Sequence, residues 1–144
     1  MPPVALDTNG YVEILRGGPR SGAIRQAIGD AGVRLVLLMP VMLELLQGAP
    51  TPRAARAVRH RLLDPVPERR RIAATAAEWA ATGDLVAAML RAGHDGTELE
   101  RRSFWLDVHV AHLCRSRGIT LLTDDRDHTR IRPHVGHTTR PLPT

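Results

Sequence analysis

Lysine is absent from this chain, so its 20 lysine-or-arginine positions are all arginine. A Walker A phosphate loop and Schiff-base chemistry both require lysine, so both kinds of site are excluded. The single cysteine, Cys114, excludes an internal disulfide and is typical of a protein in a reducing cytoplasm. Only four residues are aromatic, which argues against the stacking surfaces of common RNA-binding modules.

Long apolar runs are also missing. The longest uncharged stretch, Leu35–Leu43, is too short to cross a bilayer. No basic segment followed by an apolar run precedes Asp7, so we expect no signal peptide and a cytoplasmic protein without a membrane partner. The 144 residues, of which 43% are hydrophobic and 24% charged, suit a single domain over residues 1–144.

The net charge is +5, because the basic residues outnumber 15 acidic ones. A basic surface favours a polyanionic partner, with nucleic acid as the first candidate, although composition alone fits a basic protein without one equally well. Arginines gather in a segment capped by Thr51, Arg53–Arg61, and in Arg69–Arg71. These segments either bind RNA phosphates or form solvent-exposed faces.

Short apolar runs alternate with helical patterns along the chain. We expect buried strands at Val4–Leu6, Leu35–Met39 and Ile119–Thr123, and part of the tail 133–144 is a candidate edge strand. Helices are expected between them, with Ser21 as an N-cap, one or two helices over Ile72–Ala92 with Gly83–Asp84 as a candidate break, and a helix over Leu99–Arg117. Continuous apolar strands between helices predict a three-layer α/β/α domain with a central, mostly parallel sheet.

Acidic residues follow two of the predicted strands. Asp7 comes after the first strand, and Asp124 and Asp125 come after the third. Ligands of such sheets bind beyond the carboxyl ends of the strands, so these side chains mark a candidate site. A simple helix cap is the alternative interpretation for Asp7 and for the later cluster.

Two further acids lie in apolar surroundings. Glu44 is the only charged residue between Arg34 and Arg53, and Asp107 lies on the apolar face of its predicted helix. A buried carboxylate is costly unless it is paired or binds a cation. The alternative is a solvent-facing position for Glu44 and a buried pair with an arginine for Asp107.

Together these acids predict a site with only oxygen ligands, which suits Mg²⁺ or Mn²⁺ better than zinc. Such an ion beside a phosphate can activate water for phosphodiester hydrolysis. A zinc site made by His109, His112 and Cys114 is a weaker alternative, since Cys114 is expected to face the core.

Four segments in order, Leu6–Asn9, Glu44–Gly48, Asp107–Ala111 and Gly118–Asp127, resemble the PIN domain, and more narrowly the VapC-type toxins of bacterial toxin–antitoxin pairs. The resemblance covers nearly the whole chain. His109, His112 and His128 depart from the common pattern.

The resemblance implies a catalytic, metal-binding quartet and several supporting residues. The quartet is Asp7, Glu44, Asp107 and Asp125, with Asp127 as an outer ligand and Thr8, Asn9 and Thr123 as orienting residues. Since adjacent residues at a strand end point to opposite sides, only one of Asp124 and Asp125 can face the pocket. The resemblance selects Asp125.

The implied function is that of a Mg²⁺- or Mn²⁺-dependent endoribonuclease. The resemblance further implies a toxin that cleaves tRNA, rRNA or mRNA, forms homodimers and is inhibited by a cognate antitoxin. Two alternatives remain open at this point: a non-catalytic nucleic-acid-binding PIN module, and a flap-type DNA nuclease.

Overall fold

The computed structural model describes residues 2–93 and 102–144, and a parallel sheet forms the centre of this part of the chain. Its five strands lie in the order β3-β2-β1-β4-β5. The strands are β1 (Val4–Leu6), β2 (Leu35–Leu38), β3 (Arg71–Ile72), β4 (Thr120–Leu122) and β5 (Thr138–Arg140). Every neighbouring pair is parallel.

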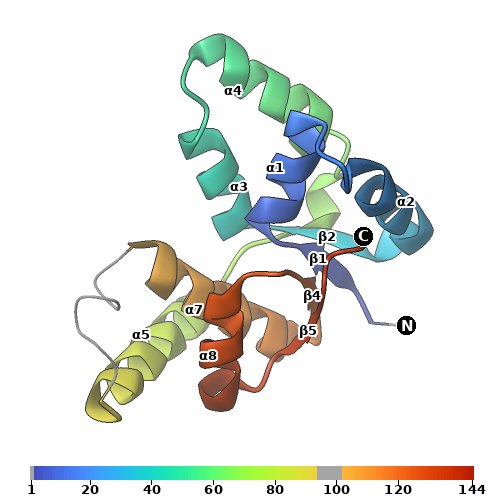
Figure 1. Ribbon diagram of the computed structural model, residues 1–144. Helices are drawn as coiled ribbons and strands as arrows, with labels where there is room; N and C mark the ends of the chain where they lie inside the picture. Colours follow the sequence, from blue (N-terminus) through green and yellow to red (C-terminus); the bar gives the residue numbers. More distant parts are fainter. Residues whose placement is uncertain (1, 94–101) are drawn as a thin grey trace.

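Helices cover both faces of this sheet (Figure 1). One face carries α1 (Thr8–Arg16), α2 (Ser21–Ala31), α3 (Met39–Gln47) and α4 (Pro52–Val58). The other carries α5 (Ala76–Arg91), α7 (Arg102–Arg117) and α8 (Arg126–Val135). Short helical turns complete the chain: η1 (Gly32–Arg34), η2 (Arg59–Leu63) and η3 (Glu68–Arg70). The predicted three-layer α/β/α fold with a parallel sheet is confirmed.

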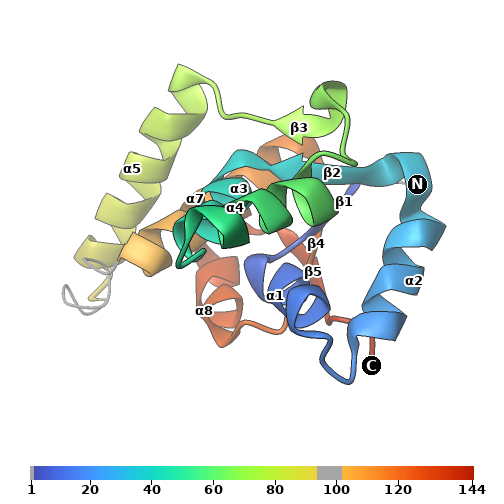
Figure 2. The ribbon, with the colours of Figure 1, turned by 90° about the horizontal axis from the view of Figure 1, so that it is seen from above.

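The direction of the connections reverses between β1 and β4. From β1 the chain passes through α1 and α2 to β2, whereas from β4 it passes through α8 to β5 on the other face. Viewed from above, α2 and α5 lie at opposite ends of the molecule (Figure 2). In sheets of this type, ligands bind at the carboxyl ends of the two strands where the connections reverse.

Some local expectations were wrong. The strand β3 was not expected, because two residues at a sheet edge leave no apolar run in the sequence. The candidate break at Gly83–Asp84 is absent, since α5 continues through it to Arg91. Ser21 is the first residue of α2, and the N-cap position is held by Arg20. The expected helix start at Leu99 lies outside the described residues.

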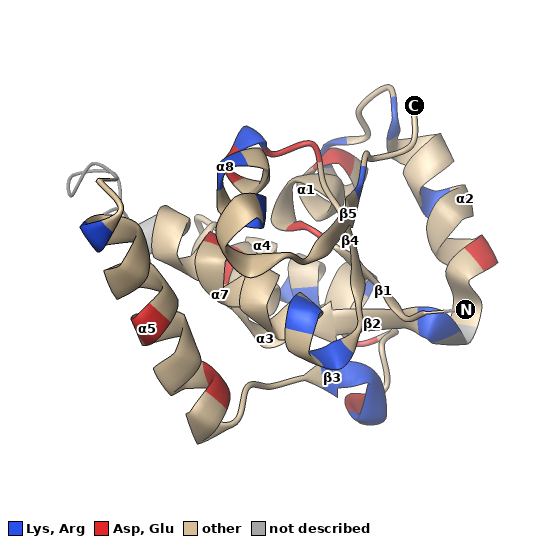
Figure 3. Cartoon of the chain, turned by 90° about the horizontal axis from the view of Figure 1, so that it is seen from below, with Lys and Arg blue, Asp and Glu red and all other residues tan. Residues whose placement is uncertain are grey.

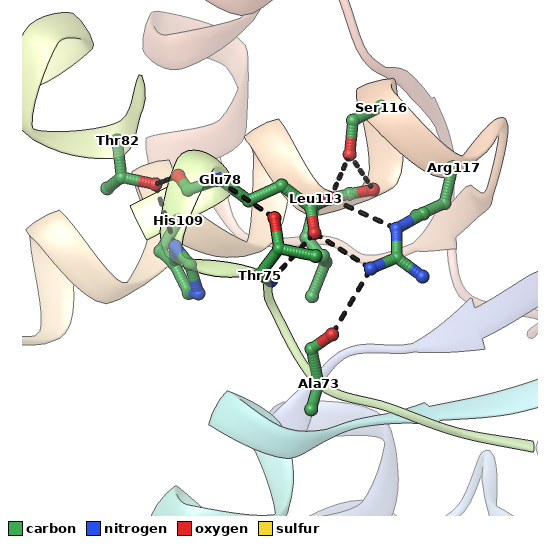
Figure 4. Close-up of polar contacts among 8 residues, drawn as sticks. All are labelled: Ala73, Thr75, Glu78, Thr82, His109, Leu113, Ser116 and Arg117. Atoms are coloured by element: carbon green, nitrogen blue, oxygen red, sulfur yellow. Dashed lines mark hydrogen bonds and ion pairs between the residues drawn. The ribbon is translucent and has the colours of Figure 1, made fainter. Parts of the chain in front are cut away.

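Polar contacts join the start of α5 to the end of α7 (Figure 4). Thr75 and Glu78 form a capping box at the start of α5. The Glu78 carboxylate also accepts hydrogen bonds from Ser116 Oγ at 2.5 Å and from Arg117 Nη2 at 2.7 Å. These bonds hold the pKa of Glu78 well below its usual range. The contacts fix α7, the helix that carries Asp107, against α5.

None of the helices in the described residues combines the length and the hydrophobicity that a bilayer crossing requires.

Gly10 gives the first testable prediction. A Cβ atom at this buried position would lie 2.4 Å from Leu6 Cδ1 and 3.1 Å from Leu142 Cδ2, so α1 packs closely on β1 and the C-terminal segment only without a side chain there. We expect Gly10→Ala to lower the free energy of unfolding by about 1–3 kcal/mol. The control is Gly29→Ala in α2, where a Cβ atom would meet nothing within 4 Å. This substitution should raise the free energy of unfolding by up to about 1 kcal/mol. Chemical denaturation measures both, and equal stability of the two variants would contradict the close packing.

Candidate metal centre

The carboxyl ends of β1 and β4 lie side by side, with Leu6 in register with Leu122. The backbone amide of Asp7 donates to the carbonyl of Leu122 at 3.0 Å, which continues the pairing one residue beyond β1. The first residues after the two strands, Asp7 and Thr123, are therefore neighbours although 116 positions separate them. This places them where the connections of the sheet reverse.

Both carboxylate oxygens of Asp7 have defined contacts. Oδ1 accepts a hydrogen bond from the Thr8 amide at 2.9 Å. Asp7 is therefore the N-cap of α1, as the helix-cap interpretation of this residue predicted. Oδ2 accepts a bond from Thr123 Oγ1 at 2.6 Å, which no helix cap requires. Only 4% of Asp7 is exposed. The side chain is thus both a cap and a fixed carboxylate at the strand edge.

Thr123 connects the two strand ends through its hydroxyl group. While the hydroxyl donates to Asp7, it accepts a bond from the Asp125 amide at 3.0 Å. Asp125 in turn caps α8, because its Oδ1 accepts from the Asp127 amide at 2.9 Å. One hydroxyl therefore orients Asp7 and the turn that carries Asp125.

Three carboxylates converge at this edge. One oxygen each of Asp107, Asp125 and Asp127 lie within 4.8 Å of one another. Asp107 comes from α7 on the buried side of the cluster, whereas Asp125 and Asp127 belong to the turn into α8. In Figure 3 the acidic positions on α7 and in the loop before α8 are red, and blue arginine positions lie next to them on α8.

The electrostatics of Asp107 show how closely the acids approach. Burial, followed by repulsion from Asp7, Asp125, Glu44 and Asp127, raises the pKa of Asp107 from its ordinary value of 3.8 to about 9. The other four acids of the predicted site therefore all act on Asp107. Without a cation, the folded protein holds a proton on Asp107 at neutral pH.

Glu44 lies beside this cluster on α3 and is half-buried. Thr8 Oγ1 donates to Glu44 Oε1 at 3.3 Å, so the Thr8 hydroxyl contacts Glu44, while the Thr8 amide bonds to Asp7. Asn9, the other orienting residue implied by the resemblance, is exposed in the first turn of α1.

Asp124 and Asp125 point to different partners, as their adjacent positions predicted. Asp124 forms an ion pair with Arg20, and its Oδ1 accepts a hydrogen bond from the Leu142 amide at 3.0 Å. Both contacts lower the pKa of Asp124. Asp124 thus fastens the C-terminal segment, and Asp125 joins the carboxylate cluster.

Two buried histidines, of which His128 lies beside Asp7, were not expected at the site. His128 Nδ1 lies 3.1 Å from His137 Nε2, and His128 Nε2 lies 3.9 Å from Asp7 Oδ2. Burial lowers the pKa of both rings, and that of His137 falls to about 4, so His137 is uncharged at neutral pH. The only signal in the sequence was the position of His128 next to Asp127.

The donor set suits a small hard cation. Mg²⁺ and Mn²⁺ prefer carboxylate oxygens, and each of the three converging residues supplies one. A bound cation would also take the place of the proton on Asp107. The zinc alternative has no support in the described residues, where His109, His112 and Cys114 do not form a converging group. Burial raises the pKa of the Cys114 thiol to about 12, which leaves it unreactive.

Comparison with known proteins agrees with this architecture. The profile of the PIN domain matches residues 4–132. A chain in the crystal structure of DNA-bound VapBC from Salmonella typhimurium superposes with a TM-score of 0.73 over 99% of both chains. The two sequences are 21% identical, so this similarity concerns the fold. No curated protein sequence gives a significant match.

The fold and the site define a three-layer α/β/α protein with a carboxylate cluster where the connections of its sheet reverse. The match of the PIN domain profile over residues 4–132 identifies the family within this class of folds. The chain belongs to the PIN domain family.

The raised pKa of Asp107 gives the second prediction. The unfolded chain releases this proton above about pH 4, whereas the folded protein keeps it up to about pH 9, so folding becomes less favourable as the pH rises between these values. Asp107→Asn removes this effect. In EDTA, we expect the stability of the variant relative to wild type to grow from pH 5 to pH 8, by at most about 1.4 kcal/mol per pH unit.

Thermal and chemical denaturation in EDTA at the two pH values measures this difference. Mg²⁺ at about ten times its Kd should stabilise wild type by about 1.4 kcal/mol and the variant less. A variant that unfolds well below wild type in EDTA would show that Asp107 is a structural partner of another group.

Proposed function

We propose that this protein is a Mg²⁺- or Mn²⁺-dependent endoribonuclease and the toxin of a toxin–antitoxin pair, with tRNA, rRNA or mRNA as its substrate. The observation that carries the proposal is the convergence of Asp107, Asp125 and Asp127 within 4.8 Å in a PIN domain. The similarity to a chain of the VapBC complex supports the toxin–antitoxin part at the level of the fold.

The carboxylates have distinct tasks in this proposal. Asp7, Glu44, Asp107 and Asp125 would hold the cation, with Asp127 as an outer ligand. A bound Mg²⁺ or Mn²⁺ supplies a Lewis acid that lowers the pKa of water and offsets negative charge on the phosphate. Thr123 keeps Asp7 and Asp125 in place through its two hydrogen bonds, and Thr8 does the same for Glu44.

The surroundings of the cluster favour a nucleic-acid substrate. The protein carries a net charge of +5 although acids gather at one edge, so its remaining surface is basic. Arg126 and Arg132 lie on α8, whose first turn also carries Asp127, where they can meet phosphates, while Arg130 forms an ion pair with Asp127. Arg71, by contrast, donates to the carbonyls of Val66 and Leu63 at 3.0 and 3.1 Å. It therefore stabilises the chain before β3, and of the two interpretations of Arg69–Arg71 given above, RNA binding is not the one we propose for Arg71.

One assay separates the proposal from its two rivals. Purified protein is incubated with total RNA and with single-stranded and flap DNA, in Mn²⁺ and in EDTA. Cleavage of RNA that requires Mn²⁺ supports the proposal. Binding without cleavage would favour the non-catalytic module, and cleavage of DNA alone would favour the flap-type nuclease.

The carboxylates themselves give the third prediction. We expect Asp7→Asn, Asp107→Asn and Asp125→Asn each to lower the single-turnover rate of RNA cleavage more than tenfold. A tenfold loss corresponds to a rise of about 1.36 kcal/mol in the activation free energy. The matched control is Asp124→Asn, which removes a neighbouring carboxylate bound to Arg20. It should lose stability but keep its rate at a temperature where it is folded. Equal loss of rate at 124 and 125 would contradict the assignment.

An antitoxin has a suitable place beside the acids. A cavity of about 300 Å³ lies between α1, α3 and α4, and both Thr8 and Glu44 line it. Its other walls are largely apolar, including Val12, Leu15 and Leu45. A segment of the antitoxin that fills this cavity would cover Glu44 and block the site, which supports inhibition by a partner protein.

We also propose a homodimer, supported by an apolar surface on α3 and α5. Leu43 is 51% exposed and Trp79 is 49% exposed, and both line a cavity of about 220 Å³. Trp79 stacks on the buried ring of His109 with 3.8 Å between the ring centres, so its exposed position is fixed.

The fourth prediction concerns this surface. Leu43→Gln should shift the protein toward monomer in sedimentation velocity. Leu90→Gln removes an equally exposed leucine of α5 that does not line the cavity, and it should leave the dimer intact. A monomeric wild type, or equal behaviour of the two variants, would contradict a dimer through this surface.

A further inference from the structure

A third cavity lies on the α1–α2 face, away from the carboxylate edge. It has a volume of about 540 Å³ and lies between α1, α2, η2 and the first residue of β2, Leu35. The acids follow the carboxyl ends of the strands, whereas Leu35 begins its strand, so the cavity is at the opposite end of the sheet. Figure 2 shows α2 there, on the side of the molecule away from α5.

The walls of this cavity are mainly apolar. They include Ile14 of α1, Ile28 of α2, Leu35 of β2, and Leu62 and Val66 on either side of the turn after η2. A volume of this size is in the range of pockets that enclose small ligands. The apolar side chains would favour an alkyl or aromatic body over a sugar–phosphate chain.

The charged residues that line the cavity all have the same sign. Arg25, Arg61 and Arg70 contribute guanidinium groups and His60 adds an imidazole, and no acidic residue of the described chain lines the cavity. Arg25 and Arg61 are exposed, so they lie where the cavity meets solvent. A ligand that fits this distribution carries negative charge at one end.

Two buried donors of the same lining have no hydrogen-bond partner within the described residues: the Tyr11 hydroxyl and Arg70 Nε. Tyr11 is only 3% exposed, and a buried tyrosine hydroxyl usually finds a partner. Burial raises its pKa to about 12, so the group remains a donor at neutral pH. Arg70 lines the same cavity and is held in place, since its Nη1 donates to the Gly32 carbonyl at 2.9 Å.

We propose that this cavity binds a small amphipathic anion, an apolar body that ends in a single carboxylate or similar group. The apolar walls enclose the body, the two unpartnered donors supply hydrogen bonds to the anionic oxygens, and Arg25 and Arg61 supply attraction at the opening. This site is separate from the carboxylate cluster, and it goes beyond the proposed nuclease function.

The test uses octanoate as the probe, with 1-octanol and acetate as matched ligands that lack the charge and the apolar body. Binding is followed through the methyl NMR signals of Ile14 and Ile28 in the full chain. EDTA is present throughout, so nuclease activity and metal binding play no part and their failure would leave this result unaffected. We expect saturable shifts with octanoate, at least tenfold weaker binding of octanol and no shifts with acetate.

Variants test the role of each group. Tyr11→Phe keeps the ring and removes only the unpartnered hydroxyl, so we expect octanoate to bind about tenfold more weakly while the ligand-free protein is at least as stable as wild type. Arg25→Gln and Arg61→Gln should each weaken binding severalfold and reduce its dependence on salt. Arg91→Gln, an exposed arginine at the end of α5, is the control and should bind as wild type does.

Equal binding of octanol and octanoate would overturn the proposal, as would full affinity in Tyr11→Phe. Chemical shifts that do not saturate with octanoate would also overturn it. So would shifts that are largest for residues of the cavity beside Leu43. If octanoate causes no shifts but an acidic, apolar peptide shifts the signals of Ile14 and Ile28, the proposal is overturned and the cavity is a protein-docking site.

Discussion

Repulsion among carboxylates packed at one edge of the sheet is the constraint on which the site of this protein depends. Asp107 is buried next to four other acids, and its pKa rises to about 9 as a result. Such a cluster is costly in a folded protein unless a proton or a cation offsets its charge. The Thr123 hydroxyl, the two helix caps and the parallel register of β1 and β4 hold the acids in spite of this repulsion.

Much of this arrangement could be predicted from the sequence, because strand ends and helix faces are local properties. Val4–Leu6 and the run ending at Thr123 indicated parallel strands, and acids directly after parallel strands must meet at one edge. Strand geometry predicted that only one of Asp124 and Asp125 would face the pocket, and the two residues do have different partners. The apolar neighbours of Asp107 indicated its burial, which the structure confirms with 6% exposure.

The remaining features depend on contacts between distant segments. The strand β3 has two residues, and only its pairing with Leu37 and Leu38 makes it a strand. Gly83 lies inside α5 without breaking it. The capping box at the start of α5, and the hydrogen bonds from Ser116 and Arg117 to Glu78, stabilise this helix. The pairing of His128 with His137, and the cavity that Tyr11 shares with Arg70, join residues whose local patterns carry no sign of each other.

The central claim is that the cluster is a cation site whose charge is balanced by a proton when no cation is bound. Calorimetric titration with Mn²⁺ at pH 7, repeated in buffers of different ionisation enthalpy, measures both the affinity and the protons released. The account predicts saturable binding with release of about one proton from wild type, and with no such release from Asp107→Asn. An absence of Mn²⁺ binding, or equal proton release from the two proteins, would contradict it.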